Sequence, residues 1–350
     1  MKTNTDDQKQ IMMDRYLGCL LGGAAGDALG YPIEFQTEQQ IKKTYGSCGI
    51  QTLSQAGTPA LVSDDTQMSL FAVNAILFAD KHQVNLRDAL WTAYQEWLGT
   101  QGDTSRMNDP KHPLMWIYHD PRLHFRRAPG STCLSAIRTG NMGGTIYQPI
   151  NNSKGCGTVM RAAPFGLAGF FDPQYMTGED IIGVHKMAVC DAALTHGHIY
   201  AWASSSLLAQ IIFYIVKKRP NHNYPLQDAV CYVEVPYAPE VHQLLLTAVD
   251  LAVNQHISDI DAIHLLGKGW VAEEALAIAV FCAIRYQNDF SGALRAAVNH
   301  GGDSDSTGAI CGNILGAWLG NKIIEQSLDF KNLELKDLIT QMAVSLFELS

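Results

Sequence analysis

Positive charge is scarce in this sequence and is nowhere concentrated. Lysine and arginine together number 25, against 34 aspartates and glutamates, so the formal net charge is −9, and no basic block of five or more residues occurs. Proteins that bind nucleic acid neutralise phosphates with clustered Lys and Arg. The composition therefore argues against a nucleic-acid partner.

Long apolar runs and paired cysteines are also missing. The most apolar run, 206–216, contains Gln210 and is too short to span a bilayer, and the polar residues 1–10 do not resemble a signal peptide. The eight cysteines are scattered without the C-x-x-C spacing of zinc or redox sites, which makes buried free thiols the default. We therefore expect a cytoplasmic chain with no membrane partner.

The alternation with a period of two that marks β-strands is absent as well. Apolar residues instead recur every three and four positions, as on one face of an α-helix, and hydrophobic residues make up 47% of the chain. The predicted helices cover 11–29, 68–79, 85–98, 180–195, 200–216, 240–253, 259–266, 271–285, 292–298, 308–320 and 333–349. Stretches rich in Gly, Pro, Asn and other polar residues predict long loops at 36–61, 99–130 and 139–157. The fold class that follows is all-α.

Two carboxylates stand two residues apart just before the apolar run 308–320. Inside a helix, Asp303 and Asp305 would point about 200° apart. In a turn that enters a helix they can converge, and converging oxygen donors favour a hard cation such as Mg²⁺, Mn²⁺ or Ca²⁺. The alternative is a plain helix start, in which one Asp or Ser caps the helix and the acids offset its dipole.

A second cluster far upstream repeats this chemistry. Ser63, Asp64, Asp65 and Thr66 precede the helical run 68–79. Two such clusters suggest two helix ends that face each other across one site, where four carboxylates would neutralise two divalent ions. Because the clusters lie near opposite ends of the chain, we expect a single domain over 1–350, with 1–10 as a flexible polar N-terminus.

Three further features are ambiguous by themselves. Glu34 follows a helix-breaking stretch, where a solvated surface acid is the usual outcome. The small residues of 153–158 could present backbone N–H groups to phosphates, although plain loops share this composition. His196 stands near a helix end, where a core or capping histidine is common. Asp27 is interpreted as structural, capping or bonding within the Gly-rich turn. Arg161 is interpreted as a structural ion-pair partner in preference to a phosphate clamp, and His300 as structural.

In order along the chain, the stretches 18–30 with Glu34, 63–68, 153–161 and 301–308 resemble the ADP-ribosylglycohydrolase family, and 269–276 is similar to it too. The resemblance implies a compact all-α domain with a central binuclear metal site. It also implies Mg²⁺-dependent N-glycoside hydrolysis that frees ADP-ribose from modified protein side chains. The partners would be an ADP-ribosylated protein and ADP-ribose itself.

The same resemblance implies a role for individual residues. Two Mg²⁺ ions, or Mn²⁺ in their place, would be held by Ser63, Asp64, Asp65, Asp303, Asp305 and Ser306. Glu34, on the family's mobile acidic flap, or Asp65 would activate the attacking water. ADP-ribose would be bound by Ser153, Lys154, Gly155, Cys156, Gly157, Thr158 and His196. Cys156 stands where some members carry Asn.

The serines of both acidic clusters look like those of the arginine-specific hydrolases, whereas the branch that acts on serine linkages carries threonines. ADP-ribosylarginine is therefore the expected substrate. Alternatives are a hydrolase of another ADP-ribose linkage, a non-catalytic ADP-ribose-binding or immunity-type protein on the same fold, and a helical metal-dependent phosphohydrolase. The last would release phosphate or a nucleoside monophosphate instead of ADP-ribose.

Overall fold

The computed structural model describes residues 2–140, 142–169, 180–217, 226–235 and 237–349. Its α-helices are α1 (Lys2–Gly30), α2 (Glu38–Tyr45), α3 (Leu53–Ala56), α4 (Asp64–His82), α5 (Leu86–Thr100), α6 (Ser131–Arg138), α7 (Ala163–Ala168), α8 (Asp180–Thr195), α9 (Ile199–Lys217), α10 (Gln227–Cys231), α11 (Pro239–Val253), α12 (Asp259–Leu266), α13 (Ala272–Arg285), α14 (Phe290–Val298), α15 (Ser304–Leu319), α16 (Asn321–Ile324) and α17 (Lys336–Glu348). Short 3-10 helices lie between them: η1 (Tyr31–Ile33), η2 (Thr104–Arg106), η3 (Trp116–His119), η4 (Pro121–Leu123), η5 (Cys156–Arg161) and η6 (Phe330–Asn332). The described residues contain no β-strand, only isolated bridges. The predicted all-α fold class is confirmed.

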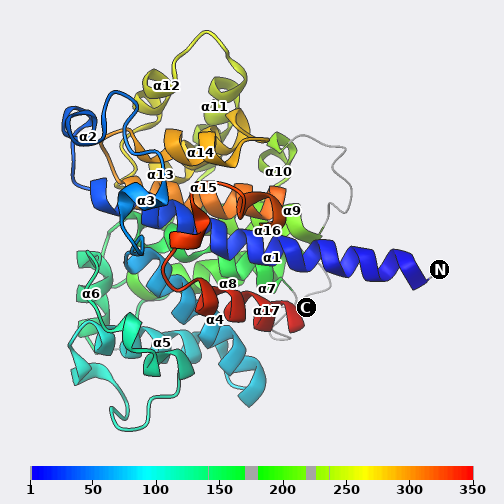
Figure 1. Cartoon of the computed structure of the whole chain (residues 1–350). Helices are drawn as coiled ribbons and strands as arrows, with labels where there is room; N and C mark the ends of the chain where they lie inside the picture. Colours follow the sequence, from blue (N-terminus) through cyan, green and yellow to red (C-terminus); the bar gives the residue numbers. More distant parts are fainter. Residues whose placement is uncertain (1, 141, 170–179, 218–225, 236, 350) are drawn as a thin grey trace.

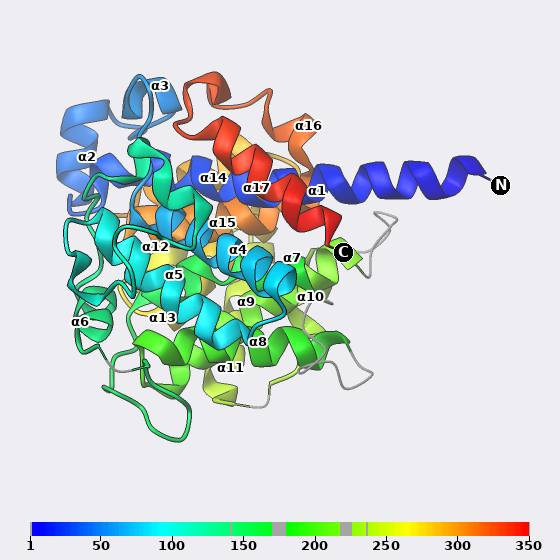
Figure 2. The same cartoon turned by 90° about the horizontal axis from the view of Figure 1, so that it is seen from below.

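The first helix and a late one form the centre of the molecule. α1 and α15 lie side by side through its middle (Figure 1). α4, α7 and α17 contact α1, while α9, α13 and α14 contact α15, so other helices surround the pair. The first turns of α1 extend beyond the rest of the fold (Figure 2) and include residues 2–10, where the sequence predicted a flexible segment.

Glycines make the contact between α1 and α15 very close. A Cβ atom added to Gly26 would lie 1.9 Å from the carbonyl oxygen of Gly308, and one added to Gly22 would lie 2.4 Å from that of Gly312. A spacing of four residues keeps such glycines on one face of each helix. A larger residue at these positions would therefore force the two helices apart.

The range 36–61, predicted as a loop, contains α2 and α3. α2 begins with a capping box, in which the Thr37 hydroxyl accepts the Gln40 N–H at 3.3 Å and the Gln40 side chain accepts the Thr37 N–H at 2.7 Å. The loop prediction was wrong here because α2 buries only Ile41 and so has no apolar periodicity.

One described helix, α9, is long and apolar enough to cross a membrane by length and composition. The fold buries 83% of its most apolar window. Core helices pass the same test, so this feature is weak evidence for a membrane span.

Candidate active site

An acid on the central helix α1 fixes the start of α4. The buried carboxylate of Asp27 accepts the Ser63 N–H at 3.0 Å, the Thr66 N–H at 3.1 Å and the Thr66 hydroxyl. Ser63 is the N-cap of α4, and its Oγ accepts the Asp65 N–H at 3.2 Å. Burial raises the pKa of Asp27 to about 6 in spite of these bonds. Asp27 therefore has the structural role expected of it, but its partners are Ser63 and Thr66 at the start of α4 and not residues of its own Gly-rich turn.

The second acidic cluster opens α15. Asp303 is the N-cap, with φ −76° and ψ 81°, so it lies outside the helical spiral and can turn toward Asp305. Its carboxylate accepts the Ser306 N–H at 3.3 Å and the Cys156 thiol at 2.7 Å. Asp305 accepts the same Ser306 N–H at 3.0 Å. Side chains two residues apart, which diverge inside a helix, thus converge at this helix entry.

Glu34 reaches the acids of α15 from the turn that follows η1. Carboxylate oxygens of Glu34, Asp303 and Asp305 all lie within 4.8 Å of one another. Among the described residues, Oε2 of Glu34 and Oδ2 of Asp65 are buried without a hydrogen-bond partner. A buried, unpaired carboxylate oxygen is costly, and a divalent cation with oxygen ligands would satisfy it. The donor set therefore fits a hard metal ion.

Burial and crowding make these acids hard to ionise. Burial, and then the charges of Asp303 and Asp64, raise the pKa of Glu34 to about 9. Burial is also the main cause that raises the pKa of Asp64 to about 8. The pKa values of Asp65 and Asp305 rise well above the usual range for the same reason, reinforced by their acidic neighbours. A cation would oppose all of these shifts, because nearby positive charge favours the carboxylate.

The acids line a cavity of about 380 Å³. The predicted site residues that line it are Glu34, Asp64, Asp65, Gly155, Cys156, Gly157, His196, Asp303, Asp305 and Ser306. Phe35, which no sequence pattern singled out, and Trp270 line it too. Both acidic clusters and the glycine loop (residues 153–158) therefore face one space, whose size is typical of a small-molecule site.

Other predicted site residues are not among those that line the cavity. They are Ser63, Ser153, Lys154 and Thr158. Lys154 forms an ion pair with Glu273, and the buried Thr158 hydroxyl donates to the Ala201 carbonyl at 3.4 Å. Lys154 and Thr158 therefore have partners within the protein, and a role in binding ligands stays a prediction for all four residues.

His196 and Arg161 both contact the glycine loop. Added Cβ atoms on Gly155 and Gly157 would lie 3.3 Å from the His196 ring, which shows how closely the loop covers it. Burial lowers the pKa of His196 to about 3, so the ring is neutral near pH 7. Arg161 donates to the Gly157 carbonyl at 2.8 Å and pairs with the buried Asp191 at 2.9 Å. The interpretation of Arg161 as a structural ion-pair residue is confirmed.

A further wall of the cavity comes from the turn before α6 together with the first residues of that helix. The Asp64 N–H donates to the Arg127 carbonyl at 3.0 Å, and the Asp64 carboxylate accepts the Gly130 N–H at 3.1 Å. The lining residues of this segment are Ala128, Pro129, Gly130, Ser131, Thr132 and Cys133. Sequence patterns did not identify them, since the Pro-Gly dipeptide at 129–130 indicates only a turn.

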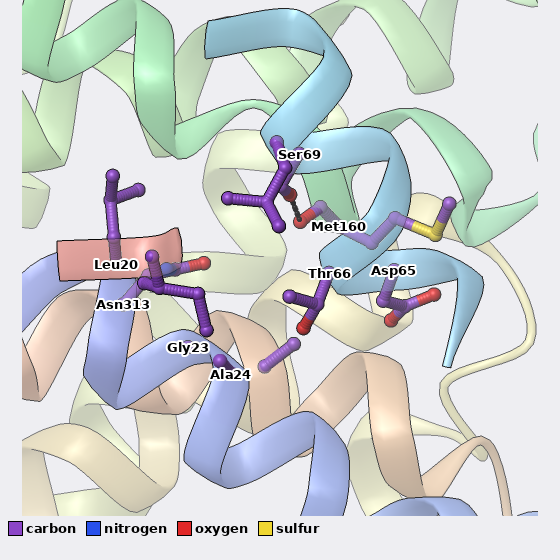
Figure 3. Close-up of a pocket in the computed structure, with 11 residues that line it drawn as sticks. Leu20, Gly23, Ala24, Asp65, Thr66, Ser69, Met160 and Asn313 are labelled. Carbon is purple, nitrogen blue, oxygen red and sulfur yellow. Dashed lines mark hydrogen bonds between the residues drawn. The ribbon is translucent and has the colours of Figure 1, made fainter. Parts of the chain in front are cut away.

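α1, α4 and α15 pack closely beside Asp65 (Figure 3). Leu20 of α1 and Asn313 of α15 face α4 across a second cavity of only about 20 Å³. The Ser69 hydroxyl bridges to the Met160 carbonyl at 3.3 Å, and the Asp65 carboxylate points away from Leu20 and Asn313. A space of this size holds one water at most. A substrate must therefore approach the acids from the larger cavity.

Comparisons with known proteins extend over the whole chain. The family model described as ADP-ribosylglycohydrolase matches residues 8–350. The ADP-ribosyl-[dinitrogen reductase] glycohydrolase of Rhodospirillum rubrum is 27% identical over 320 residues, which cover 88% of this chain and 86% of that protein. An uncharacterized protein of Archaeoglobus fulgidus is 28% identical over 346 residues, 97% of each protein. A solved structure described as an ADP-ribosylglycohydrolase-related protein complex shares the fold, with a TM-score of 0.64, 21% identity and coverage of 97% of this chain and 99% of that one. Since the family model matches nearly every residue, this chain belongs to the ADP-ribosylglycohydrolase family.

Proposed function

We propose that this protein is a Mg²⁺-dependent hydrolase that releases ADP-ribose from modified protein side chains, with ADP-ribosylarginine as its substrate. Membership of the family supports a hydrolase that acts on ADP-ribose conjugates, and the arginine linkage and the dependence on Mg²⁺ are our proposal. The observation that carries the proposal is the group of acids, with unpartnered buried oxygens on Glu34 and Asp65, in one cavity with the glycine loop.

The metal ligands would come from the starts of α4 and α15. The proposed set is Ser63, Asp64, Asp65, Asp303, Asp305 and Ser306, which offers enough carboxylate charge for two divalent ions. Bound there, Mg²⁺ or Mn²⁺ would hold the distal ribose hydroxyls and orient the anomeric carbon for attack by water. Asp27 contributes indirectly, because it holds the backbone of Ser63 and Thr66 in place.

Glu34 is the proposed general base. Its carboxylate stands within 4.8 Å of those of Asp303 and Asp305, and it can take a proton from a water that attacks the anomeric carbon. It must be ionised to do so, and its raised pKa in the absence of cations means that activity should depend on metal. Asp65, whose Oδ2 is also unpartnered, is the alternative base.

The glycine loop is the proposed binding site for the ADP-ribose phosphates. Glycine at 155 and 157 lets the backbone approach a ligand closely, and Cys156 between them lines the cavity. The neutral His196 ring can hydrogen-bond to the nucleotide part without adding charge. Ser153, Lys154 and Thr158 extend this proposed surface along the same segment.

Two arguments support the arginine linkage. The serines of both acidic clusters resemble those of the arginine-specific branch. A guanidinium leaving group is cationic, and a chain of net charge −9 with acids lining its site should attract it.

The test is to offer arginine-linked, serine-linked and ester-linked ADP-ribose side by side with Mg²⁺, Mn²⁺ or EDTA. We expect the fastest ADP-ribose release from the arginine conjugate and none in EDTA. Faster release from the serine conjugate would refute the linkage, and binding without release would favour a non-catalytic ADP-ribose-binding protein. Release of phosphate or a nucleoside monophosphate would favour a phosphohydrolase.

A further inference from the structure

An aromatic pair stands at the edge of the acidic cavity. The rings of Phe35 and Trp270 are stacked, with centroids 5.7 Å apart and an angle of 15° between their planes. Both residues line the cavity, although 72% of Phe35 and 40% of Trp270 are exposed. Exposed rings add little to the core. Their contact with each other therefore calls for an explanation at the site.

The backbone hydrogen bonds of the turn that carries Glu34 stay within the turn, while the neighbouring Ile33 is fully buried in the core. The Glu34 N–H donates to the Tyr31 carbonyl at 3.5 Å, and the Gln36 N–H donates to the Ile33 carbonyl at 3.0 Å. The Gln36 side chain also stays within the turn, where it donates to the Pro32 carbonyl at 2.9 Å. These bonds shape the turn but do not tie it to the opposite side of the cavity.

Trp270, in contrast, lies on a segment that is tied to the glycine loop. Its carbonyl accepts the Cys156 N–H at 3.3 Å, and the Ala272 N–H donates to the Lys154 carbonyl at 2.8 Å. A bridge between Gly155 and Val271 lies between these two bonds. Trp270 thus gives Phe35 a fixed surface on the segment that borders the glycine loop.

We propose that the stack of Phe35 on Trp270 positions Glu34 over the metal-binding acids by fastening its turn to the segment that borders the glycine loop. This proposal rests on the function proposed above and adds two positioning residues to it. Phe35 directly follows Glu34, so a movement of its ring away from Trp270 also moves the Glu34 backbone. An exposed aromatic pair changes the equilibrium between the stacked and the unstacked turn by about 2- to 10-fold.

Single and double substitutions test the pair. Phe35→Ala and Trp270→Ala should each lower kcat for ADP-ribose release by about 3- to 10-fold and leave the affinity for free ADP-ribose unchanged. The double variant should lose no more than either single variant, because all three lack the same contact. Phe35→Tyr keeps the ring and should restore the wild-type kcat.

The chain offers a matched control. Tyr214 and Tyr232 form a stack of nearly the same geometry, 5.7 Å and 18°, and neither lines the cavity. Tyr232 is also largely exposed, at 65%. Tyr232→Ala therefore removes an equivalent aromatic contact and should leave kcat unchanged.

Amide hydrogen exchange tests the same contact without catalysis. The amides of residues 34–36 should exchange about 2- to 10-fold faster in Phe35→Ala and Trp270→Ala than in the wild type. Tyr232→Ala should leave their exchange unchanged.

Three results would overturn the proposal. A weaker affinity for ADP-ribose at constant kcat would mean that the rings bind substrate. Additive losses of kcat in the double variant would mean that the two rings act separately. Unchanged amide exchange at residues 34–36 would mean that other contacts hold the turn. A wild-type protein that releases no ADP-ribose would contradict the proposed function, and the exchange experiment would still decide the role of the pair.

Discussion

Replacing Asp305 by Asn is expected to raise stability and abolish activity together. Asn keeps the oxygen that accepts the Ser306 N–H at 3.0 Å, so the start of α15 loses no hydrogen bond. The substitution removes one negative charge from the group formed by Glu34, Asp303 and Asp305, whose oxygens lie within 4.8 Å of one another. The metal-free variant should therefore be more stable than the wild type, and it should lack a ligand for Mg²⁺.

The magnitude follows from Coulomb's law. Two unit charges 4.8 Å apart repel by about 3.5 kcal/mol at an effective dielectric constant of about 20. The acids are partly protonated without metal, which lowers the expected gain in the free energy of unfolding to about 1–3 kcal/mol. The unfolding entropy of 350 residues is roughly 0.7 kcal/mol/K, so Tm should rise by about 1.5–4 °C.

The assay is thermal unfolding of wild type and variant in EDTA and in Mg²⁺, together with ADP-ribose release. Mg²⁺ should raise the Tm of the wild type but not that of Asp305→Asn, which should release no ADP-ribose. Asp250→Asn, which neutralises an exposed acid on α11, is the matched control and should behave like the wild type. A variant less stable than the wild type in EDTA, or one that keeps Mg²⁺-dependent activity, would refute the reasoning.

Three further predictions concern the base, the pH dependence and the central helices. Glu34→Gln should lower kcat by about 10²–10⁴-fold with little change in ADP-ribose affinity, because the substitution keeps the shape of the side chain and removes the base. Steady-state kinetics measure kcat and calorimetric titration measures the affinity. Near-normal turnover would favour Asp65 as the base. The metal-free protein should lose stability as the pH rises from about 4 to about 9, because Glu34 and Asp64, with pKa values of about 9 and about 8, keep protons in the folded state that the unfolded chain releases near pH 4. Urea unfolding in EDTA at several pH values measures this, and a stability that increases with pH would contradict it. Gly26→Ala should destabilise the protein by about 1–3 kcal/mol or more, since the added Cβ would lie 1.9 Å from the Gly308 carbonyl oxygen. Thermal unfolding followed by circular dichroism measures this, and an unchanged Tm would show that α1 and α15 separate without cost.

Most helices could be predicted because their apolar faces are periodic. The predicted helix 259–266 has the bounds of α12, and the predicted range 200–216 lies within α9. α2 escaped prediction because it buries only Ile41 and lies on the surface. Periodicity identifies a helix only where the core covers one of its faces.

The meeting of the acidic clusters could be predicted because each opens a helix, and a helix entry lets nearby oxygen donors converge. The contacts that support the site could not. The bonds from Asp27 to Ser63 and Thr66 join helices that are distant in sequence, and no local spacing marks them. No sequence pattern marks the stack of Phe35 on Trp270 either, because these two residues are also distant in sequence. Such contacts are fixed by tertiary packing alone.

The glycine contact between α1 and α15 also ties the site to the timing of protein synthesis. Most of the sequence separates Gly26 from Gly308, and at about 5–20 residues per second the ribosome needs roughly 15–60 s to make it. During this interval the glycine face of α1 has no partner, and glycine makes an isolated helix unstable. Pairing of such distant segments is also slow, because a long loop must close first. A growing chain therefore cannot bring its acids together, or form the proposed site, until α15 has emerged.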